Sequence, residues 1–151
     1  MKKYLSTILL GLITGIFLCT LFTKTYTNNE LKVSSGTNKL YFVQYGVYSS
    51  IDSMEKNTIS LENYIYTNIG DLYYVFIAIT NNEDALEIIK KYYKDQNIDT
   101  IVKEFNITNK KFVNIVNKYD KEIINTKDNS YISSLISEVL VKYEEENSDK
   151  N

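Results

Sequence analysis

The 151-residue sequence contains no His, no Pro and no Trp, all 17 of its basic residues are Lys, and it has a single Cys. Without His, the chain cannot form a Ser-His-Asp or Cys-His catalytic arrangement or a His-ligated metal site. One Cys excludes an intramolecular disulfide and any zinc site built from paired cysteines. The five Gly form neither G-x-G-x-x-G nor G-x-x-x-x-G-K-[ST], so these phosphate-binding loops are absent. We therefore expect no cofactor and no metal.

Excess positive charge is also missing. Lys numbers 17 against 19 Asp plus Glu, which gives a net charge of −2. No global basic field attracts a polyanion, so we expect no nucleic-acid partner.

One long apolar run stands at the start of the chain. Residues 4–22, YLSTILLGLITGIFLCTLF, carry no charge, Lys2 and Lys3 precede them and Lys24 follows. At about 1.5 Å per residue, this run spans about 28 Å, close to the hydrocarbon thickness of a bilayer. Residues 1–24 are thus expected to form a cytoplasmic N-terminus and a single transmembrane helix. A cleaved signal peptide and a lipid-anchored Cys19 are the alternatives.

This anchor places the rest of the chain outside the cytoplasmic membrane. Residues 25–151 hold 14 of the Lys and all 19 acids, a net charge of −5. Residues 25–39, TYTNNELKVSSGTNK, are polar and aperiodic, as is typical of a linker.

Residues 40–107 alternate between short apolar runs and amphipathic segments. The runs predict strands at 40–48, 63–69, 72–80 and 100–107, and helical periodicity predicts helices at 50–61 and 82–96. The order β-α-β-β-α-β is that of a split βαβ, or ferredoxin-like, α+β domain. A weak repeat at an offset of 32 supports it, because Ser49 with Asp52 and Asn81 with Asp84 have the spacing of helix caps.

Residues 108–151 have a different, helical pattern. Two apolar stripes, one from Phe112 to Ile123 and one from Ile132 to Tyr143, are separated by residues 126–129. We expect a helical hairpin followed by a frayed acidic tail from Glu144. Residues 40–107 already complete a β-α-β-β-α-β unit, so we expect them to fold without this extension.

Two motifs within 40–107, VQYGVY at residues 43–48 and LYYVFIA at residues 72–78, resemble those of the SPOR (sporulation-related repeat) family. Residues 43–48, VQYGVY, resemble its opening V-Q-x-G-x-[FY], and residues 72–78, LYYVFIA, resemble its later L-Y-x-V-x-V-G. Residues 82–85, NEDA, resemble the acidic-Ala start of its second helix. The chain departs from the family pattern at three points. Ala78 stands where the family usually has Gly, the Pro that follows in the family is missing, and Met54 stands where the first helix of the family often has Ala.

The resemblance implies a four-stranded antiparallel sheet with two helices on one face. It also implies binding of peptidoglycan glycan strands that have lost their stem peptides, by a single-pass membrane protein of cell division or spore formation.

Strand alternation identifies candidate glycan-binding residues. Val43, Tyr45 and Val47 share one face of the first strand, and Val75, Ile77 and Ile79 share one face of the third; these aliphatic faces are expected to meet the helices. The opposite face then carries the candidate site, which comprises Phe42, Gln44, Tyr74 and Phe76. Aromatic rings cover the C–H patches of a pyranose, and an amide donates to and accepts from sugar hydroxyls. Packing of this face under the C-terminal helices is the alternative.

No residue pattern points to catalysis. The Glu83-Asp84 pair has the chemistry of a glycoside hydrolase, but a predicted helix start already explains its position. We therefore expect a non-enzymatic, extracytoplasmic glycan-binding module of a division or sporulation protein. The alternative is a membrane-anchored scaffold that holds other envelope or division proteins through the sheet and the C-terminal helices. An RNA-recognition fold shares the element order but would require a basic sheet in the cytoplasm.

Overall fold

A computed structural model describes residues 38–148. The expected membrane-spanning segment at 4–22 and nearly all of the expected linker lie outside the described residues. Within 38–148, no helix combines the length and the apolar character needed to cross a bilayer.

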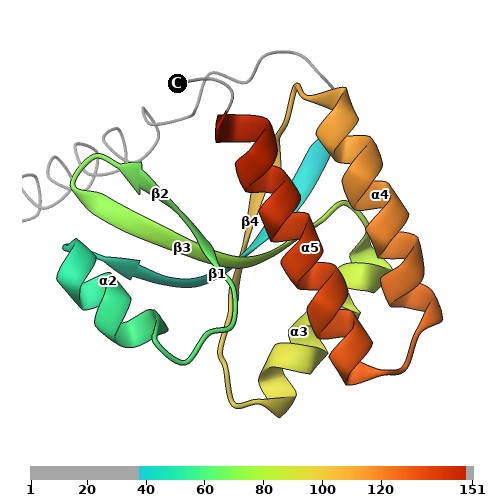
Figure 1. The fold of residues 1–151 in the computed structure, drawn as a ribbon, viewed down its shortest axis with the longest axis horizontal. Coiled ribbons are helices and arrows are strands. Elements are labelled where there is room, and N and C mark those ends of the chain that lie inside the picture. The colour runs from blue at the N-terminus through green and yellow to red at the C-terminus, as the bar shows by residue number, and fades with distance from the viewer. Residues whose placement is uncertain (1–37, 149–151) are drawn as a thin grey trace, which may run out of the picture. The chain divides into compact units, whose positions relative to one another are not determined.

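The described residues form four strands and four helices (Figure 1). In chain order they are β1 (Lys39–Tyr48), α2 (Ile51–Thr58), β2 (Ile65–Ile69), β3 (Leu72–Thr80), α3 (Glu83–Asp95), β4 (Ile101–Asn106), α4 (Lys110–Asn125) and α5 (Asn129–Ser148). The predicted β-α-β-β-α-β order and the C-terminal pair of helices are confirmed. Helix α5 continues through the expected acidic tail to Ser148.

The starts of α2 and α3 are capped by local side chains. The hydroxyl of Ser50 accepts a hydrogen bond from the Ser53 amide at 3.2 Å, and Oδ1 of Asn82 accepts from the Asp84 amide at 2.8 Å. Each cap satisfies an amide that has no partner within its helix. Both caps lie one residue after the predicted positions, so the offset of 32 between them is kept.

The strands form one antiparallel sheet in the order β2-β3-β1-β4. This is the order expected for a ferredoxin-like fold, with β1 and β3 in the centre. Gly70, at φ 64°, closes the β2–β3 hairpin in a left-handed conformation that glycine adopts at little cost.

Two irregularities interrupt the pairing of β1 with β3. The register shifts between Val43 and Gln44 and again between Gln44 and Gly46, so Ile77 of β3 and Tyr45 of β1 have no direct partner. Because side chains alternate along a strand, each shift exchanges the faces that later residues occupy.

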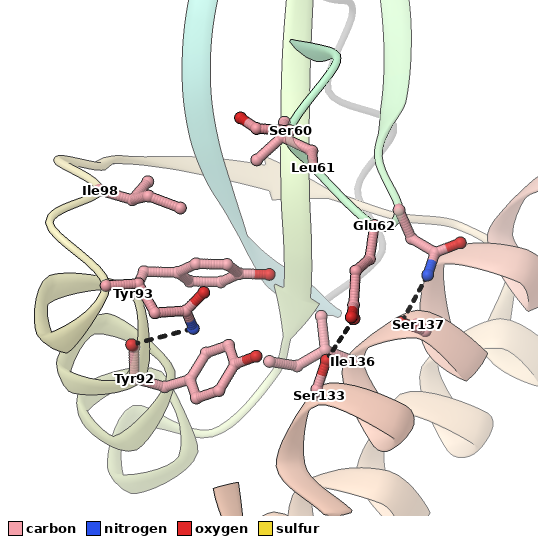
Figure 2. Close-up of a pocket in the computed structure, with 11 residues that line it drawn as sticks. Ser60, Leu61, Glu62, Tyr92, Tyr93, Ile98, Ser133, Ile136 and Ser137 are labelled. Carbon is pink, nitrogen blue, oxygen red and sulfur yellow. Dashed lines mark hydrogen bonds between the residues drawn. The ribbon is translucent and has the colours of Figure 1, made fainter. Parts of the chain in front are cut away.

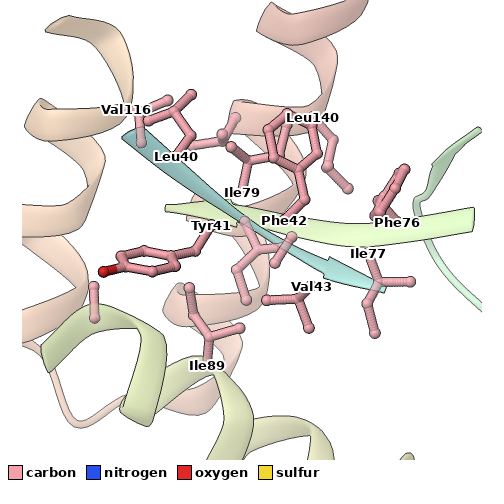
Figure 3. Packing of buried hydrophobic residues seen from close by; sticks show 14 of the residues in the cluster. Leu40, Tyr41, Phe42, Val43, Phe76, Ile77, Ile79, Ile89, Val116 and Leu140 are labelled. Carbon is pink, nitrogen blue, oxygen red and sulfur yellow. The ribbon is translucent and has the colours of Figure 1, made fainter. Parts of the chain in front are cut away.

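The first shift changes the predicted faces of β3. Phe42 pairs with Ile79, and Figure 3 shows the Ile79 side chain on the side of Leu140 in α5. Val43 and Ile77 lie on the other side of the sheet, toward Ile89 of α3. The expectation that Ile79 shares a face with Ile77 is therefore wrong, because simple alternation ignores the extra residue.

The sheet is covered on both sides where β1 begins and β3 ends. Helix α3 packs against one side and the α4–α5 hairpin against the other (Figure 3). Leu40 and Phe42 of β1 belong to the same buried apolar cluster as Val116 of α4 and Leu140 of α5. The hairpin thus contributes to the core of the domain, in contrast to the expectation that 40–107 completes it alone.

A buried carboxylate fixes α4 to the end of β3. Asp120, 2% exposed, accepts a hydrogen bond from the Thr80 hydroxyl at 2.7 Å and from the Asn81 amide at 2.8 Å. Burial raises the pKa of Asp120, while these hydrogen bonds oppose that rise.

Candidate functional site

The rings of Phe42 and Phe76 lie in the core. Each side chain is 3% exposed, and the two rings meet edge-on with centroids 5.4 Å apart. Phe105 of β4 packs against Phe42 at 4.9 Å and Tyr143 of α5 at 5.6 Å, both edge-on. The expectation that Phe42 and Phe76 lie on an open face is not met, because α5 and β4 supply aromatic rings that cover them.

Gln44 is also buried, but its amide is not fully satisfied. The residue is 4% exposed and pairs with Phe76 on one side and Ile101 on the other. Among residues 38–148, Oε1 of Gln44 has no hydrogen-bond partner. Leaving such an acceptor unpaired costs about 1–3 kcal/mol, so an external donor at this position would be strongly favoured.

Tyr74 lies on the same face of the sheet and remains accessible. It is two residues from Phe76 on β3, is half-buried, and pairs with Val47 and Thr67. Val47 is 39% exposed and Ile101, the β4 neighbour of Gln44, is 57% exposed. The accessible part of this face therefore consists of Tyr74 with Val47, Thr67 and Ile101, and Gln44 lies beneath its margin.

Gly46 allows the side chain of Tyr48 to lie close to the backbone of β1. A Cβ atom at Gly46 would lie 2.6 Å from the hydroxyl of Tyr48 and 2.9 Å from its ring. The glycine of the V-Q-x-G-x-Y motif thus lets the Tyr48 ring lie flat on β1, next to the second register shift.

The Glu83-Asp84 pair has the structural position expected for it. Both residues lie in the first turn of α3, and the Tyr41 hydroxyl donates to Oε1 of Glu83 at 3.0 Å. Within 38–148, no three His, Cys, Asp or Glu side chains are close enough together to hold a metal ion.

A groove that the sequence did not predict lies between three segments far apart in the chain. Residues 60–63, the end of α3 and the first half of α5 surround it (Figure 2). Its walls carry Glu62, Tyr92, Gln96 and a row of serines on α5 that includes Ser133 and Ser137. The only sequence signal was the spacing of serines at 130, 133, 134 and 137, which puts them on one helical face.

No protein-family model and no curated protein matches the chain. Among solved structures, the chain is similar to the peptidoglycan-binding domain of the cell wall lytic enzyme CwlC of B. subtilis. The match has 26% sequence identity and a TM-score of 0.38, and it covers 50% of this chain and 100% of that domain.

Proposed function

We propose that this protein is a non-catalytic module that binds glycan strands of peptidoglycan, in a bacterial cell-division or sporulation protein. The observation that carries the proposal is the buried, unpaired Oε1 of Gln44 at the margin of an accessible sheet face. The motifs at 43–48 and 72–78 support it, as does the four-stranded antiparallel sheet, which the family resemblance implies.

Tyr74 and Gln44 contact different parts of the sugar. The half-buried Tyr74 ring covers the C–H patch of a pyranose, with the exposed Val47 beside it. A hydroxyl or N-acetyl N–H of the sugar donates to Oε1 of Gln44 once a movement of this side chain uncovers the buried oxygen. Phe42 and Phe76 act indirectly, because their edge-on packing next to these two residues holds β1 and β3 in place.

The binding face carries no cluster of cations. Lys103 of β4 is an exposed positive charge on the strand next to β1. The chain outside the anchor is acidic overall, which disfavours a strongly anionic polymer and is compatible with a neutral, stripped glycan.

The proposed location is the outer side of the cytoplasmic membrane, with residues 4–22 as a single anchor and residues 25–151 outside. Protease added to intact protoplasts is then expected to degrade the C-terminal part of the protein. Full protection of that part would contradict this topology.

Sedimentation with purified sacculi tests the binding. The full-length chain is expected to sediment with sacculi whose stem peptides have been removed by an amidase, and to a smaller extent with untreated sacculi. Failure to sediment with the amidase-treated sacculi would overturn the proposal.

One observation favours a second function, as a scaffold subunit for envelope or division proteins. Tyr143 of α5 lies against Phe42, so the C-terminal hairpin occupies part of the sheet face. On the outer surface of α5, Tyr131 and Val141 are each 45% exposed. A photocrosslinker at Val141 that captures one defined envelope protein in cells, together with no binding to sacculi, would support the scaffold over the glycan-binding module.

A further inference from the structure

The groove between α3 and α5 is held open by two hydrogen bonds on one of its walls. The Ser133 hydroxyl donates to Oε2 of Glu62 at 3.0 Å, and Nδ2 of Asn63 donates to the Ser137 hydroxyl at 2.8 Å. Both bonds join the segment before β2 to α5 (Figure 2). They fix the distance between these elements, so the hollow beside them is part of the folded structure.

The opposite wall is also fixed in place. The Tyr93 hydroxyl donates to the carbonyl of Ile77 in β3 at 2.8 Å, which anchors the end of α3 to the sheet. Tyr92 packs edge-on against Tyr93, with ring centroids 5.1 Å apart, and its own ring projects into the groove (Figure 2). A rigid aromatic side chain thus faces the serines of α5.

The groove consists of two adjoining hollows of about 190 and 490 Å³. Leu61, Ile98 and Ile136 supply apolar groups to the lining, while hydroxyl, amide and carboxylate groups make up the larger part of its exposed surface. A mostly polar lining with a few apolar side chains suits a ligand that carries many hydroxyls.

The charge of the groove lining disfavours anionic ligands. Glu62 is the only charged residue that lines either hollow, and it takes part in no ion pair within residues 38–148. A carboxylate without a neighbouring cation repels anionic ligands and accepts hydrogen bonds from hydroxyls. Together with an aromatic face and serine hydroxyls, it provides the contacts that a neutral sugar requires.

We infer that this groove is a second saccharide site, which binds a neutral N-acetylated sugar unit with its ring against Tyr92 and its hydroxyls on Glu62 and Ser133. The inference rests on the proposed function for the choice of sugar, but uses none of the sheet-face residues. It also gives the C-terminal hairpin a role in binding, because α5 contributes Ser133 and Ser137 to the groove.

The test uses a β-1,4-linked N-acetylglucosamine trimer and the full-length chain with Tyr74→Ala, so that the contribution of the sheet face is reduced. Calorimetry is expected to show saturable binding that Glu62→Ala and Ser133→Leu each weaken at least tenfold. The leucine fills the groove, and the alanine removes an exposed carboxylate without disturbing the core. Glu55→Ala on α2 removes another exposed carboxylate and is the matched control, with unchanged binding expected.

Thermal melting identifies any variant that fails to fold, and Glu62→Ala remains informative if Ser133→Leu does not fold. Absence of trimer binding, or binding that Glu62→Ala leaves unchanged, would overturn the inference. Sedimentation of the Glu62→Ala chain, with Tyr74 intact, with amidase-treated sacculi reports separately on the sheet face and thus on the proposed function. A protein that binds glycan only through the sheet face can therefore be told apart from one that binds it only through the groove.

Discussion

The ring of Phe42 on β1 meets the ring of Tyr143 on α5 edge-on, with centroids 5.6 Å apart and an interplanar angle of 81°. This contact joins the predicted glycan-binding face to the end of the C-terminal hairpin. It divides the face into a covered part, around Phe42 and Phe76, and an accessible part, around Tyr74.

Removal of the hairpin is predicted to unfold the domain. A chain that ends at Thr108 loses the helices that cover Leu40, Phe42 and Ile79, all of which are at most 3% exposed. Each large apolar side chain returned to water costs about 1.5–3 kcal/mol, against a typical total stability of about 5–15 kcal/mol. Circular dichroism is expected to show no cooperative melt.

A chain that ends at Ser148 is the control for this truncation and is expected to melt like the full-length protein. A cooperative melt of the shorter chain, close to that of the control, would show that residues 40–107 form an independent domain.

Asp120→Asn is predicted to change the pH dependence of stability. Burial raises the pKa of Asp120 above its ordinary value of 3.8, so the folded state binds a proton more tightly than the unfolded state does. The stability that this proton provides is full below the unfolded pKa and is lost as the pH rises through the folded pKa.

The free energy of unfolding of the wild type minus that of Asp120→Asn is therefore expected to be largest in acid. It falls as the pH rises through the raised pKa and is constant above it. Urea denaturation at a series of pH values measures this difference, and a difference that grows with pH would contradict the account.

Gly46→Ala is predicted to destabilise the protein only while Tyr48 is present. The new methyl group would lie 2.6 Å from the Tyr48 hydroxyl, so the ring must move off β1. We expect a loss of at most about 1 kcal/mol in the free energy of unfolding, because the end of the half-exposed Tyr48 side chain can move, and no loss in a Tyr48→Ala background. Equal losses in the two backgrounds would mean that the glycine is required for another reason.

Local signals along the chain predicted the elements well. The caps at Ser50 and Asn82 lie only one residue from their predicted positions. Capping can be predicted because it depends on residues that are close together in the sequence. The register shifts beside Gln44 could not be predicted, because an extra residue in a strand leaves the apolar alternation unchanged at the sequence level.

The site was less predictable than the fold. The stripe that includes Leu140 showed that one face of α5 is buried, but amphipathicity does not say which surface it covers. The groove at Tyr92 could not be predicted either, since it is formed by three segments that only the tertiary structure brings together.

Tyr74→Ala and Val75→Ala are predicted to have opposite effects, although the residues are adjacent. Tyr74 is half-buried on the accessible face, whereas Val75 is fully buried. Loss of the Tyr74 ring is expected to weaken sedimentation with sacculi roughly 5- to 150-fold, which corresponds to about 1–3 kcal/mol. Val75→Ala is expected to lower the melting temperature through a cavity and to leave binding by the folded protein unchanged. Equal effects of both changes on stability, with binding intact, would assign Tyr74 to the core.

The most direct test of the glycan-binding face is Gln44→Leu, measured for both stability and binding. Leucine fills a similar volume and removes the buried amide oxygen that lacks a partner within residues 38–148, so the free energy of unfolding is expected to rise by about 1 kcal/mol. If that oxygen accepts a hydrogen bond from the glycan, the same change weakens sedimentation with amidase-treated sacculi at least fivefold. A more stable protein that binds sacculi less well is the predicted result, and a variant that binds as well as the wild type would contradict the account.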